Sequence, residues 1–423
     1  MFGWEFPPHI SGGLGTACYG LTKGLVNNAA EVLFVMPSAS GDEDTSAINI
    51  VNASDIEVSE SLRNVRTFLE KVQFMRIGSN LIPYVSPQEF SEMLSSLQEG
   101  QIEDFKLSLG KKYTFSGKYG TNLMEEVARY AMVAGEIALR NSFDIIHAHD
   151  WLTYLAGIAA KRVSGKPLVV HMHATEFDRS GQNINTQVYD IEKMGMKEAD
   201  MVIAVSHLTR NIIINKYGIH PDKVVTVHNA VDFQGFQDIQ VERGVPEKIV
   251  TFLGRITYQK GPEYFIEAAA KVLKKYPNVR FVMAGSGDLL NRSIRRVAKL
   301  GIAHKFHFTG FLKGADVKQM FAYSDVYVMP SVSEPFGISP LEAMRANVPT
   351  IISKQSGVAE VLKHAIKVDF WDIDALADSI YALLSYPALS AMAIEKGLEE
   401  VNSLKWDAAA QRVTEIYSRL LNK

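Results

Sequence analysis

The chain alternates short runs of apolar and β-branched residues with amphipathic stretches of helical period, and the alternation continues from one end to the other. Strands of a parallel sheet are covered by helices on both faces, so they appear in a sequence as short apolar runs. The pattern therefore predicts an α/β fold with doubly wound parallel sheets. In the first half it predicts strands at 32–36, 145–148, 168–171, 201–205 and 224–227, and helices at 16–27, 122–140, 154–163 and 207–217.

The second half restarts the same pattern after a polar, charged interval at 233–246. Because 423 residues exceed one ordinary hydrophobic core, we expect two Rossmann-like domains, 1–238 and 239–403, facing each other across a cleft. An amphipathic helix is expected at 406–420. The second domain is predicted to hold strands at 249–253, 280–284, 305–309, 326–328 and 350–352, and helices at 261–275, 288–300, 341–346 and 373–384.

The beginning of the chain and the interval 38–120 are less regular. Residues 1–4 are expected to end a first strand, which is either unusually short or preceded by further residues in the natural protein. Polar stretches in 38–120 surround two strand-like pieces, 66–72 and 81–85. They predict an elaboration of the first domain whose role the sequence does not reveal.

Composition narrows the function classes. A hydrophobic content of 47%, 22% charged residues and a net charge of −3 are typical of a soluble globular protein, without a basic surface for nucleic acid or anionic lipid. The single cysteine, Cys18, excludes an internal disulfide and fits a reducing compartment. No apolar run reaches the ~18 residues of a membrane span, and no signal-peptide pattern opens the chain. We therefore expect a cytoplasmic protein without integral membrane association.

Two glutamates mark the turn between the strand expected at 326–328 and the helix expected at 341–346. Glu334 and Glu342 have seven residues between them, and Gly337 in that interval lets the backbone approach a ligand. Amides at a helix start favour an anion such as phosphate, whereas carboxylates hold sugar hydroxyls or face a developing positive charge. A single glutamate before a helix usually only caps it. The combination, however, suits a sugar nucleotide.

Two loops at strand-to-helix turns add phosphate-binding chemistry. Gly12 and Gly13 lie before the helix expected at 16–27, where the missing Cβ atoms allow close approach of a phosphate or sugar, although a plain tight turn explains them equally well. Arg255 and Lys260 lie five residues apart on the loop after the strand expected at 249–253. Arginine offers a fork to two oxygens and lysine a point charge, so the pair suits a diphosphate.

A third loop carries histidines. His147 and His149 alternate at the end of the strand expected at 145–148, a spacing that could indicate a metal site. No cysteine or acidic residue stands at matching spacing, so we expect no metal.

The run 333–342, Ser-Glu-Pro-Phe-Gly-Ile-Ser-Pro-Leu-Glu, resembles the Glu-x7-Glu signature of retaining GT-B glycosyltransferases of family 4 (group 1), with further resemblance to bacterial glycogen and starch synthases. The loop 254–261 is similar to that family's diphosphate-binding loop, and 147–151 to a His-Ala-His-Asp-Trp segment of glycogen synthases. The motifs follow in the family's order over nearly the whole chain. Ala230 departs from the family, which usually has glycine there.

The resemblance implies roles for individual residues. Glu334 would orient the hydroxyls of the donor sugar and stabilise its cationic transition state, and the backbone carbonyl of His173 would lie beside the anomeric carbon. Asp150 would face the sugar and acceptor, with Trp151 as a flat contact for a sugar ring. The implied catalytic residues are Glu334, His173, Arg255, Lys260 and Asp150; those implied for donor binding are Gly12, Gly13, Arg255, Lys260, Gly285, Phe311, Leu312, Phe336, Gly337, Ile338 and Glu342.

The resemblance also implies that residues 404–423 form a helix that crosses back onto the first domain. Within the superfamily, Glu342 favours family 4, in which the second glutamate commonly holds the ribose hydroxyls. Ile10 favours it too, since family 5 synthases usually carry a lysine there. The segments 147–151 and 119–131 are more similar to α-glucan synthases.

The expected activity is transfer of a hexosyl group, with glucosyl favoured, from UDP- or ADP-glucose to a glycan, with retention and without a cofactor. The main alternative is a family 4 enzyme of cell-surface polysaccharide or glycolipid synthesis. The helix expected at 122–140 is mixed in charge, which places a lipid acceptor below a soluble glycan. A phosphorylase would need a pyridoxal phosphate lysine motif, and a non-catalytic subunit would not need the charged residues found here. The nucleotide base, acceptor, linkage and oligomeric state stay open.

Overall fold

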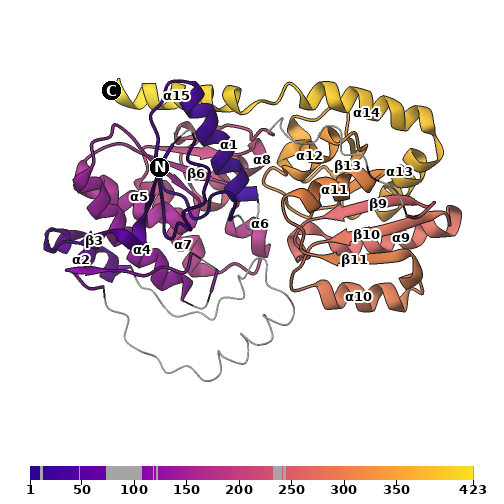
Figure 1. Ribbon diagram of the computed structural model, residues 1–423, viewed down its shortest axis with the longest axis horizontal. Helices are drawn as coiled ribbons and strands as arrows, with labels where there is room; N and C mark the ends of the chain where they lie inside the picture. Colours follow the sequence, from indigo (N-terminus) through magenta and orange to yellow (C-terminus); the bar gives the residue numbers. More distant parts are fainter. Residues whose placement is uncertain are drawn as a thin grey trace.

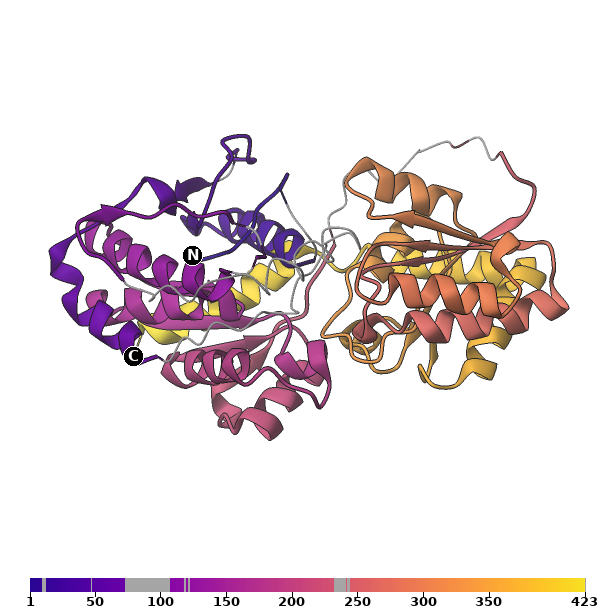
Figure 2. The ribbon, with the colours of Figure 1, turned by 90° about the horizontal axis from the view of Figure 1, so that it is seen from below.

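A computed structural model describes residues 1–9, 13–46, 48–72, 107–117, 119–120, 122–231, 241 and 244–422. The predicted fold class is confirmed: two Rossmann-like domains, each with a parallel sheet, lie side by side in Figures 1 and 2. The boundaries 1–238 and 239–403 stay predictions, because the predicted junction falls within 232–240, outside the described residues.

The first sheet consists of parallel strands, of which Ile146–His149 and Leu168–Met172 are buried along their whole length. Phe2 forms parallel bridges to both Val35 and Ala148 and so joins the pair β1–β2 to the row β5–β6–β7–β8. The strand expected at 1–4 is thus present as one bridging residue. A two-stranded antiparallel sheet, β3–β4, lies apart. The strands are β1 (Leu33–Met36), β2 (Asn49–Asn52), β3 (Glu57–Val58), β4 (Lys111–Lys112), β5 (Ile146–His149), β6 (Leu168–Met172), β7 (Met201–Ala204) and β8 (Val224–Thr226).

Helices cover this sheet because their apolar residues recur at helical spacing. In α4, for example, Val127, Ala131 and Ala134 are fully buried, and the helix packs along α5. The helices are α1 (Gly13–Asn27), α2 (Arg63–Lys71), α4 (Leu123–Arg140), α5 (Trp151–Ser164), α6 (Glu176–Ser180), α7 (Thr186–Glu198) and α8 (His207–Tyr217).

One element is assigned wrongly from the sequence. The strand expected at 66–72 is helix α2, because Val65 and Leu69, four residues apart, bury the same face of a helix. The strand expected at 81–85 lies outside the described residues. In the first domain β2, β3, β4, α6 and α7 were not predicted. In the second domain the helices Ala315–Tyr323 and Pro387–Val401 and the short strand Ile366–Val368 were not predicted either.

The second sheet has the order β11–β10–β9–β12–β13–β14, all parallel. All five strands predicted here are confirmed, with ends that differ by one residue at most. The strands are β9 (Lys248–Leu253), β10 (Val279–Ala284), β11 (Phe306–Gly310), β12 (Val326–Met329), β13 (Thr350–Ser353) and β14 (Ile366–Val368). The helices are α9 (Pro262–Lys275), α10 (Leu290–Lys299), α11 (Ala315–Tyr323), α12 (Ser339–Arg345), α13 (Ile373–Ser385), α14 (Pro387–Val401) and α15 (Trp406–Leu421).

The last helix returns to the first domain, as the fold class implies. In Figures 1 and 2, α14 lies on the second domain and the yellow α15 on the first. The contact with α1 depends on two glycines: a Cβ atom on Gly20 would overlap the Trp406 indole, and one on Gly24 would lie 2.7 Å from the Trp406 carbonyl oxygen. Buried Val413 and Ile416 complete the packing of α15. The chain therefore crosses between the domains twice.

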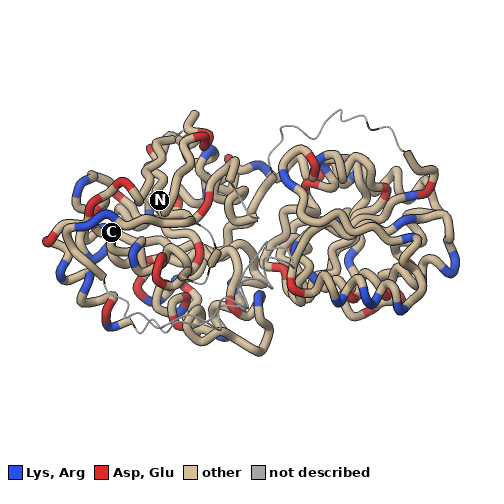
Figure 3. Tube along the Cα trace, turned by 60° about the horizontal axis from the view of Figure 1, so that its bottom comes forward, with Lys and Arg blue, Asp and Glu red and all other residues tan. Residues whose placement is uncertain are grey.

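The charged residues are interspersed over both domains in Figure 3, with blue and red segments alternating along the trace. Several form pairs between neighbouring helices, such as Arg292 of α10 with Glu263 of α9 at 2.6 Å. Among the described residues, no helix is both long and apolar enough to cross a membrane.

Candidate active site

The structure brings Lys260 and Glu334 into an ion pair, although they are 74 residues apart in the sequence. Lys260 ends the 3-10 turn η4 (Tyr258–Lys260) after β9, and Glu334 lies on the loop after β12. The Glu334 carboxylate is almost fully buried, and it also accepts a hydrogen bond from the Ser331 hydroxyl at 3.3 Å. Its backbone N–H donates to the Gln355 carbonyl at 3.0 Å. The ends of β9, β12 and β13 therefore meet at this pair.

Close packing of glycine backbones seats the loop that carries Arg255 and Lys260. A Cβ atom on Gly285 would overlap the carbonyl oxygen of Gly254, and Gly261, at φ +65°, leaves no room for one beside the Pro330 carbonyl. Arg255 donates to the Gln259 side chain at 3.0 Å. The predicted donor-binding residue Gly285 thus acts on this loop through its backbone.

The turn around Gly337 has a left-handed conformation, with φ +98°. A Cβ atom there would lie 3.1 Å from Glu334 Cγ and 3.2 Å from Met329 Sδ. Phe336 is buried, and its carbonyl accepts the Val358 N–H at 2.7 Å. Gly337 therefore allows both the left-handed turn and the close packing of Glu334 against it.

The second glutamate, Glu342, lies one turn into α12. Burial raises its pKa to about 7, and the nearby Lys318 only partly opposes this shift. Tyr327 is fully buried close to both glutamates; burial raises its pKa first, and the charges of Glu334 and Glu342 raise it further. The charges of the two predicted glutamates thus both act on the Tyr327 side chain.

In the first domain, Asp150 organises the loop after β6. Asp150 has φ +62°, uncommon for a residue with a side chain, and its carboxylate accepts from the backbone amides of His173 at 2.9 Å and Ala174 at 3.3 Å. The His173 ring shares a 2.9 Å hydrogen bond with His149. Asp150 therefore positions the backbone of His173, one of the residues expected near the donor sugar.

Four histidines stack at the ends of β5 and β6: His147, His149, His171 and His173. Adjacent ring centroids lie 4.4 to 5.4 Å apart, and the ring planes are inclined by 10° to 35°. Burial lowers the pKa of all four; for His173, the Asp150 carboxylate partly opposes the shift. The stack is therefore neutral near pH 7.

Three clusters in the described part of the chain place potential metal ligands near one another. Two of them draw on the histidine stack. Imidazole lone pairs lie in the plane of the ring, so nearly parallel rings do not converge on one ion. The third cluster is His207, His228 and Glu360, in which Glu360 already accepts from His228 at 2.7 Å and from two amides of α8. That the protein holds no metal stays a prediction.

The two domains touch through residues that sequence reasoning missed. The Ser333 hydroxyl, beside Glu334, donates to Asp178 of α6 at 2.5 Å. Asp178 in turn forms a capping box with Thr175. The Thr-x-x-Asp spacing signals this helix start in the sequence, but nothing there identifies Ser333 as a partner. Through this contact the loop that follows His173 meets the loop of Glu334.

A second junction joins α8 to the turn η6 (Gly357–Glu360). The Glu360 carboxylate accepts the backbone amides of His207 at 2.8 Å and Leu208 at 2.7 Å. Burial acts to raise the pKa of Glu360, but its hydrogen bonds to His228 and these amides prevail and lower it. Figure 1 shows α6 and α8 on the side of the first domain that faces the second.

Other predicted site residues are placed as follows. A Cβ atom on Gly13 would lie 4.0 Å from Ile338 of the other domain, so the start of α1 faces the loop before α12. Gly12 lies outside the described residues. Phe311 is 39% exposed beneath the ammonium of Lys313, and Leu312 is half-buried. The structure does not test their expected contacts with the donor.

The expectation for Trp151 is wrong. Its indole is only 6% exposed and belongs to the core of the first domain, so it presents no flat surface to a ligand. Helix α5 begins at Trp151 and is buried along nearly its whole length between α4, α7 and the sheet, which draws the ring inward. The position of Trp151 at the end of a strand predicted an exposed side chain, but the packing of α5 buries it.

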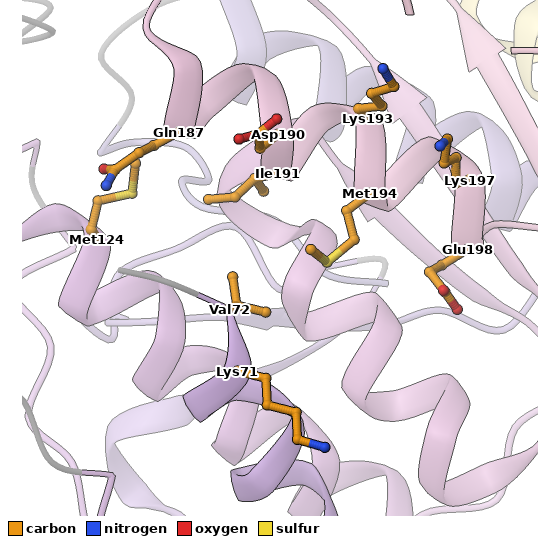
Figure 4. Close-up of a pocket in the computed structure, with 10 residues that line it drawn as sticks. All are labelled: Lys71, Val72, Met124, Gln187, Asp190, Ile191, Lys193, Met194, Lys197 and Glu198. Atoms are coloured by element: carbon orange, nitrogen blue, oxygen red, sulfur yellow. The ribbon is translucent and has the colours of Figure 1, made fainter. Parts of the chain in front are cut away.

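A cavity of about 430 Å³ lies in the first domain, away from these residues (Figure 4). It opens between α2, α4 and α7. Its lining residues are Lys71, Val72, Met124, Gln187, Asp190, Ile191, Lys193, Met194, Lys197 and Glu198. It shares no residue with the candidate active site.

Comparisons with known proteins agree with this geometry. Residues 235–400 match the family model "Glycosyl transferases group 1", and residues 119–234 match "Glycosyltransferase Family 4". An uncharacterized glycosyltransferase of Methanocaldococcus jannaschii is 28% identical, over 99% of this chain and 97% of its own length. The glycogen synthase of Mycobacterium tuberculosis is 23% identical, over 99% and 93%. The structure of Anabaena HepE in complex with UDP and glucose superposes with a TM-score of 0.60 at 21% identity, over 70% of this chain and 81% of HepE.

Proposed function

Since the chain belongs to the family 4, group 1 glycosyltransferases, we propose that it moves a hexosyl group, with glucosyl favoured, from a nucleoside diphosphate sugar to a glycan, with retention at the anomeric carbon. The observation that carries the proposal is the partly buried Lys260–Glu334 pair at the junction of the domains. The favoured donors are UDP- and ADP-glucose. The similarity to a glycogen synthase and to a protein solved with UDP and glucose supports this choice.

Lys260 and Arg255 receive the charge that develops on the leaving diphosphate. Both lie on one loop held by close glycine contacts, so little reorganisation is needed when charge appears. Glu334 fixes the ammonium of Lys260 and, with the remaining valences of its carboxylate, orients sugar hydroxyls and stabilises positive charge on the ring. Glu342, whose pKa of about 7 leaves it partly protonated at neutral pH, can either donate to or accept from a ribose hydroxyl.

In the reaction, the bond between the anomeric carbon and the diphosphate oxygen breaks, and the diphosphate takes the electron pair. The acceptor hydroxyl forms the new bond on the same face of the sugar, and its proton passes to the leaving phosphate oxygen. In this proposal the backbone carbonyl of His173 stabilises the positive charge on the anomeric carbon, and the bond from the His173 amide to Asp150 holds that stretch of backbone in place. Atoms and charge balance without a cofactor, and in this proposal the cations Arg255 and Lys260 neutralise the diphosphate in place of a metal ion.

A donor panel tests the proposal directly. Purified protein is incubated with the UDP-, ADP- and GDP-forms of glucose, galactose and mannose, and release of nucleoside diphosphate is measured. The active donor is then offered to maltooligosaccharides, glycogen, and polyprenyl or phosphatidylinositol acceptors. Extension of the α-glucans supports the proposal; activity on a lipid acceptor alone would assign the protein to glycolipid or cell-surface polysaccharide synthesis. A cytoplasmic location stays a prediction from the single cysteine.

A further inference from the structure

An aromatic row runs over the surface of the second domain. Tyr258 and Trp371 at its ends are 55% and 58% exposed, and both rank among the most exposed large hydrophobic residues described. Between them lie Tyr264 and Phe370, whose ring centroids are 5.0 Å apart. Phe370 in turn lies 4.8 Å from Trp371, edge to face. Tyr264 follows Tyr258 at the start of α9, and burial first, then Tyr258 and Glu263, raises its pKa.

The row begins at the junction of the two domains. Tyr258 shares the turn η4 with Lys260, and a Cβ atom on Gly181 of the first domain would lie 3.5 Å from the Tyr258 ring. Helix α6, which ends just before Gly181, contacts η4. One end of the row therefore stands directly beside the candidate active site.

The middle of the row is tied to Glu334 through Gln355. The backbone carbonyl of Gln355 accepts the Glu334 N–H at 3.0 Å. Its side chain accepts the Phe370 N–H at 3.4 Å and donates to Asp369 at 2.9 Å, and Asp369 also pairs with Lys354 at 2.8 Å. The segment that carries Trp371 is thus held in a defined position relative to the reaction centre.

The chemistry of the row favours a carbohydrate over a membrane. Neighbouring rings pack edge to face, and two carboxylates stand beside them: Asp369 and Asp372 flank Phe370 and Trp371 in the sequence. Lys354 pairs with Asp369, so the negative charge of Asp372 is the one that disfavours an anionic bilayer at this position. Tyrosine hydroxyls and carboxylates, by contrast, can bond to sugar hydroxyls. Aromatic side chains offer large, rigid faces at low entropic cost, and the C–H faces of sugar rings can stack on them.

We propose that this row binds the acceptor α-glucan chain outside the reaction centre and leads it toward the Lys260–Glu334 pair. The inference rests on the proposed function, because it takes the glycan acceptor as given. A chain long enough to contact Trp371 as well as the reaction centre gains affinity from both contacts. A short maltooligosaccharide in the reaction centre does not reach the outer end of the row.

The test compares Trp371→Ala with Tyr386→Ala. Tyr386 is 60% exposed and follows the far end of α13, about 20 Å along the helix axis from Trp371. Binding is measured by the retardation of the full-length protein in native gels that contain glycogen, and KM is measured for glycogen and for maltotriose. We expect Trp371→Ala to weaken glycogen binding and raise its KM on the order of two- to tenfold, with an unchanged KM for maltotriose. Tyr386→Ala and Trp371→Phe should behave like the wild type.

The outcomes separate this inference from the proposed function. If the wild type extends glycogen and Trp371→Ala binds and extends it equally well, the row is not the glucan site, while the transferase assignment stands. A parallel rise of the KM for maltotriose would mean that Trp371 acts on the reaction centre itself, which also overturns the inference. If the wild type neither binds nor extends any glucan, both proposals fail. Thermal unfolding of each variant shows whether the fold is intact.

Discussion

At the scale of single residues, the candidate site depends on the buried Glu334 and the half-buried Lys260, whose charges neutralise each other. Burying either charge alone costs several kcal/mol, so the two side chains hold each other in position. The same pairing places a cation and an anion where a diphosphate and a cationic sugar would meet them. Substitution of Lys260 and substitution of Glu334 should therefore change the kinetics of the enzyme in different ways.

Lys260→Ala should weaken donor binding and slow transfer together, because the ammonium meets the diphosphate in both the ground state and the transition state. We expect a loss of about 2–4 kcal/mol of transition-state stabilisation, measured as kcat/KM for the donor. Lys271→Ala is the matched control, since that lysine pairs with Asp374 on the outer surface. Wild-type kinetics in the Lys260 variant would remove Lys260 from the site.

Glu334→Gln should lower kcat more than it lowers donor affinity. The amide keeps the shape of the side chain and a hydrogen bond to Lys260, but it loses the charge that matters as the sugar becomes positive. Steady-state kinetics and calorimetric donor binding measure the two quantities separately. Small and equal changes in both would place Glu334 outside the reaction centre.

At the scale of elements, the contact between α1 and α15 ties the end of the chain to the first domain. Gly24→Ala should destabilise the protein by about 1–3 kcal/mol, because the new methyl group would be forced against the Trp406 carbonyl. Urea unfolding measures the change. Gly244→Ala is the control, since a Cβ atom there meets nothing within 4 Å. Equal stability of the two variants would contradict the prediction, because it would show that α1 and α15 move apart at little cost in free energy.

At the scale of the whole molecule, the stacked histidines make stability depend on pH. Burial lowers the pKa of His147, His149 and His171 below the ordinary value of 6.5, so the unfolded chain binds more protons than the folded one below that pH. The contribution of these histidines to the free energy of unfolding should therefore fall as pH drops from 7 to 5, by up to about 1.4 kcal/mol per pH unit for each histidine.

The carboxyls of Glu192 and Glu342 act in the opposite direction over the same range. Burial raises the pKa of Glu192 to about 8 and that of Glu342 to about 7, so their contribution decreases as pH rises. Comparison of the wild type with His171→Asn isolates the histidine effect, because the carboxyls are common to both. The variant should lose less stability between pH 7 and 5; identical slopes in urea unfolding would contradict the prediction.

The whole active site is also expected to work without a metal ion. In the proposed function Arg255 and Lys260 balance the charge of the diphosphate, so activity should survive dialysis against a strong chelator. Rates measured before and after dialysis, with magnesium or manganese added back, decide the matter. A loss of activity that either ion restores would assign the diphosphate to a metal instead.

The sequence by itself determined the α/β class, nearly every strand named from it, and the types of residue that form the site. Strands buried on both faces must be apolar, so β6 and β9 are each recognisable as a short apolar run. The arginine and lysine of the loop after β9, Arg255 and Lys260, are residue types that suit a diphosphate. The sequence assigns α2 wrongly because the helix is only nine residues long and buries two of them, Val65 and Leu69. Two buried positions are too few to show whether the apolar residues repeat with the period of a helix or of a strand.

Only the tertiary structure decided which loops meet. The pairing of Lys260 with Glu334, the contact of Ser333 with Asp178 and the burial of Trp151 all depend on residues distant in the chain. Local periodicity carries no information about such contacts, because it reports which face of an element is apolar and not what covers that face. The relation between the Lys260–Glu334 pair and the aromatic row likewise depends on tertiary contacts, since Gln355 and Gly181 come from different loops of different domains.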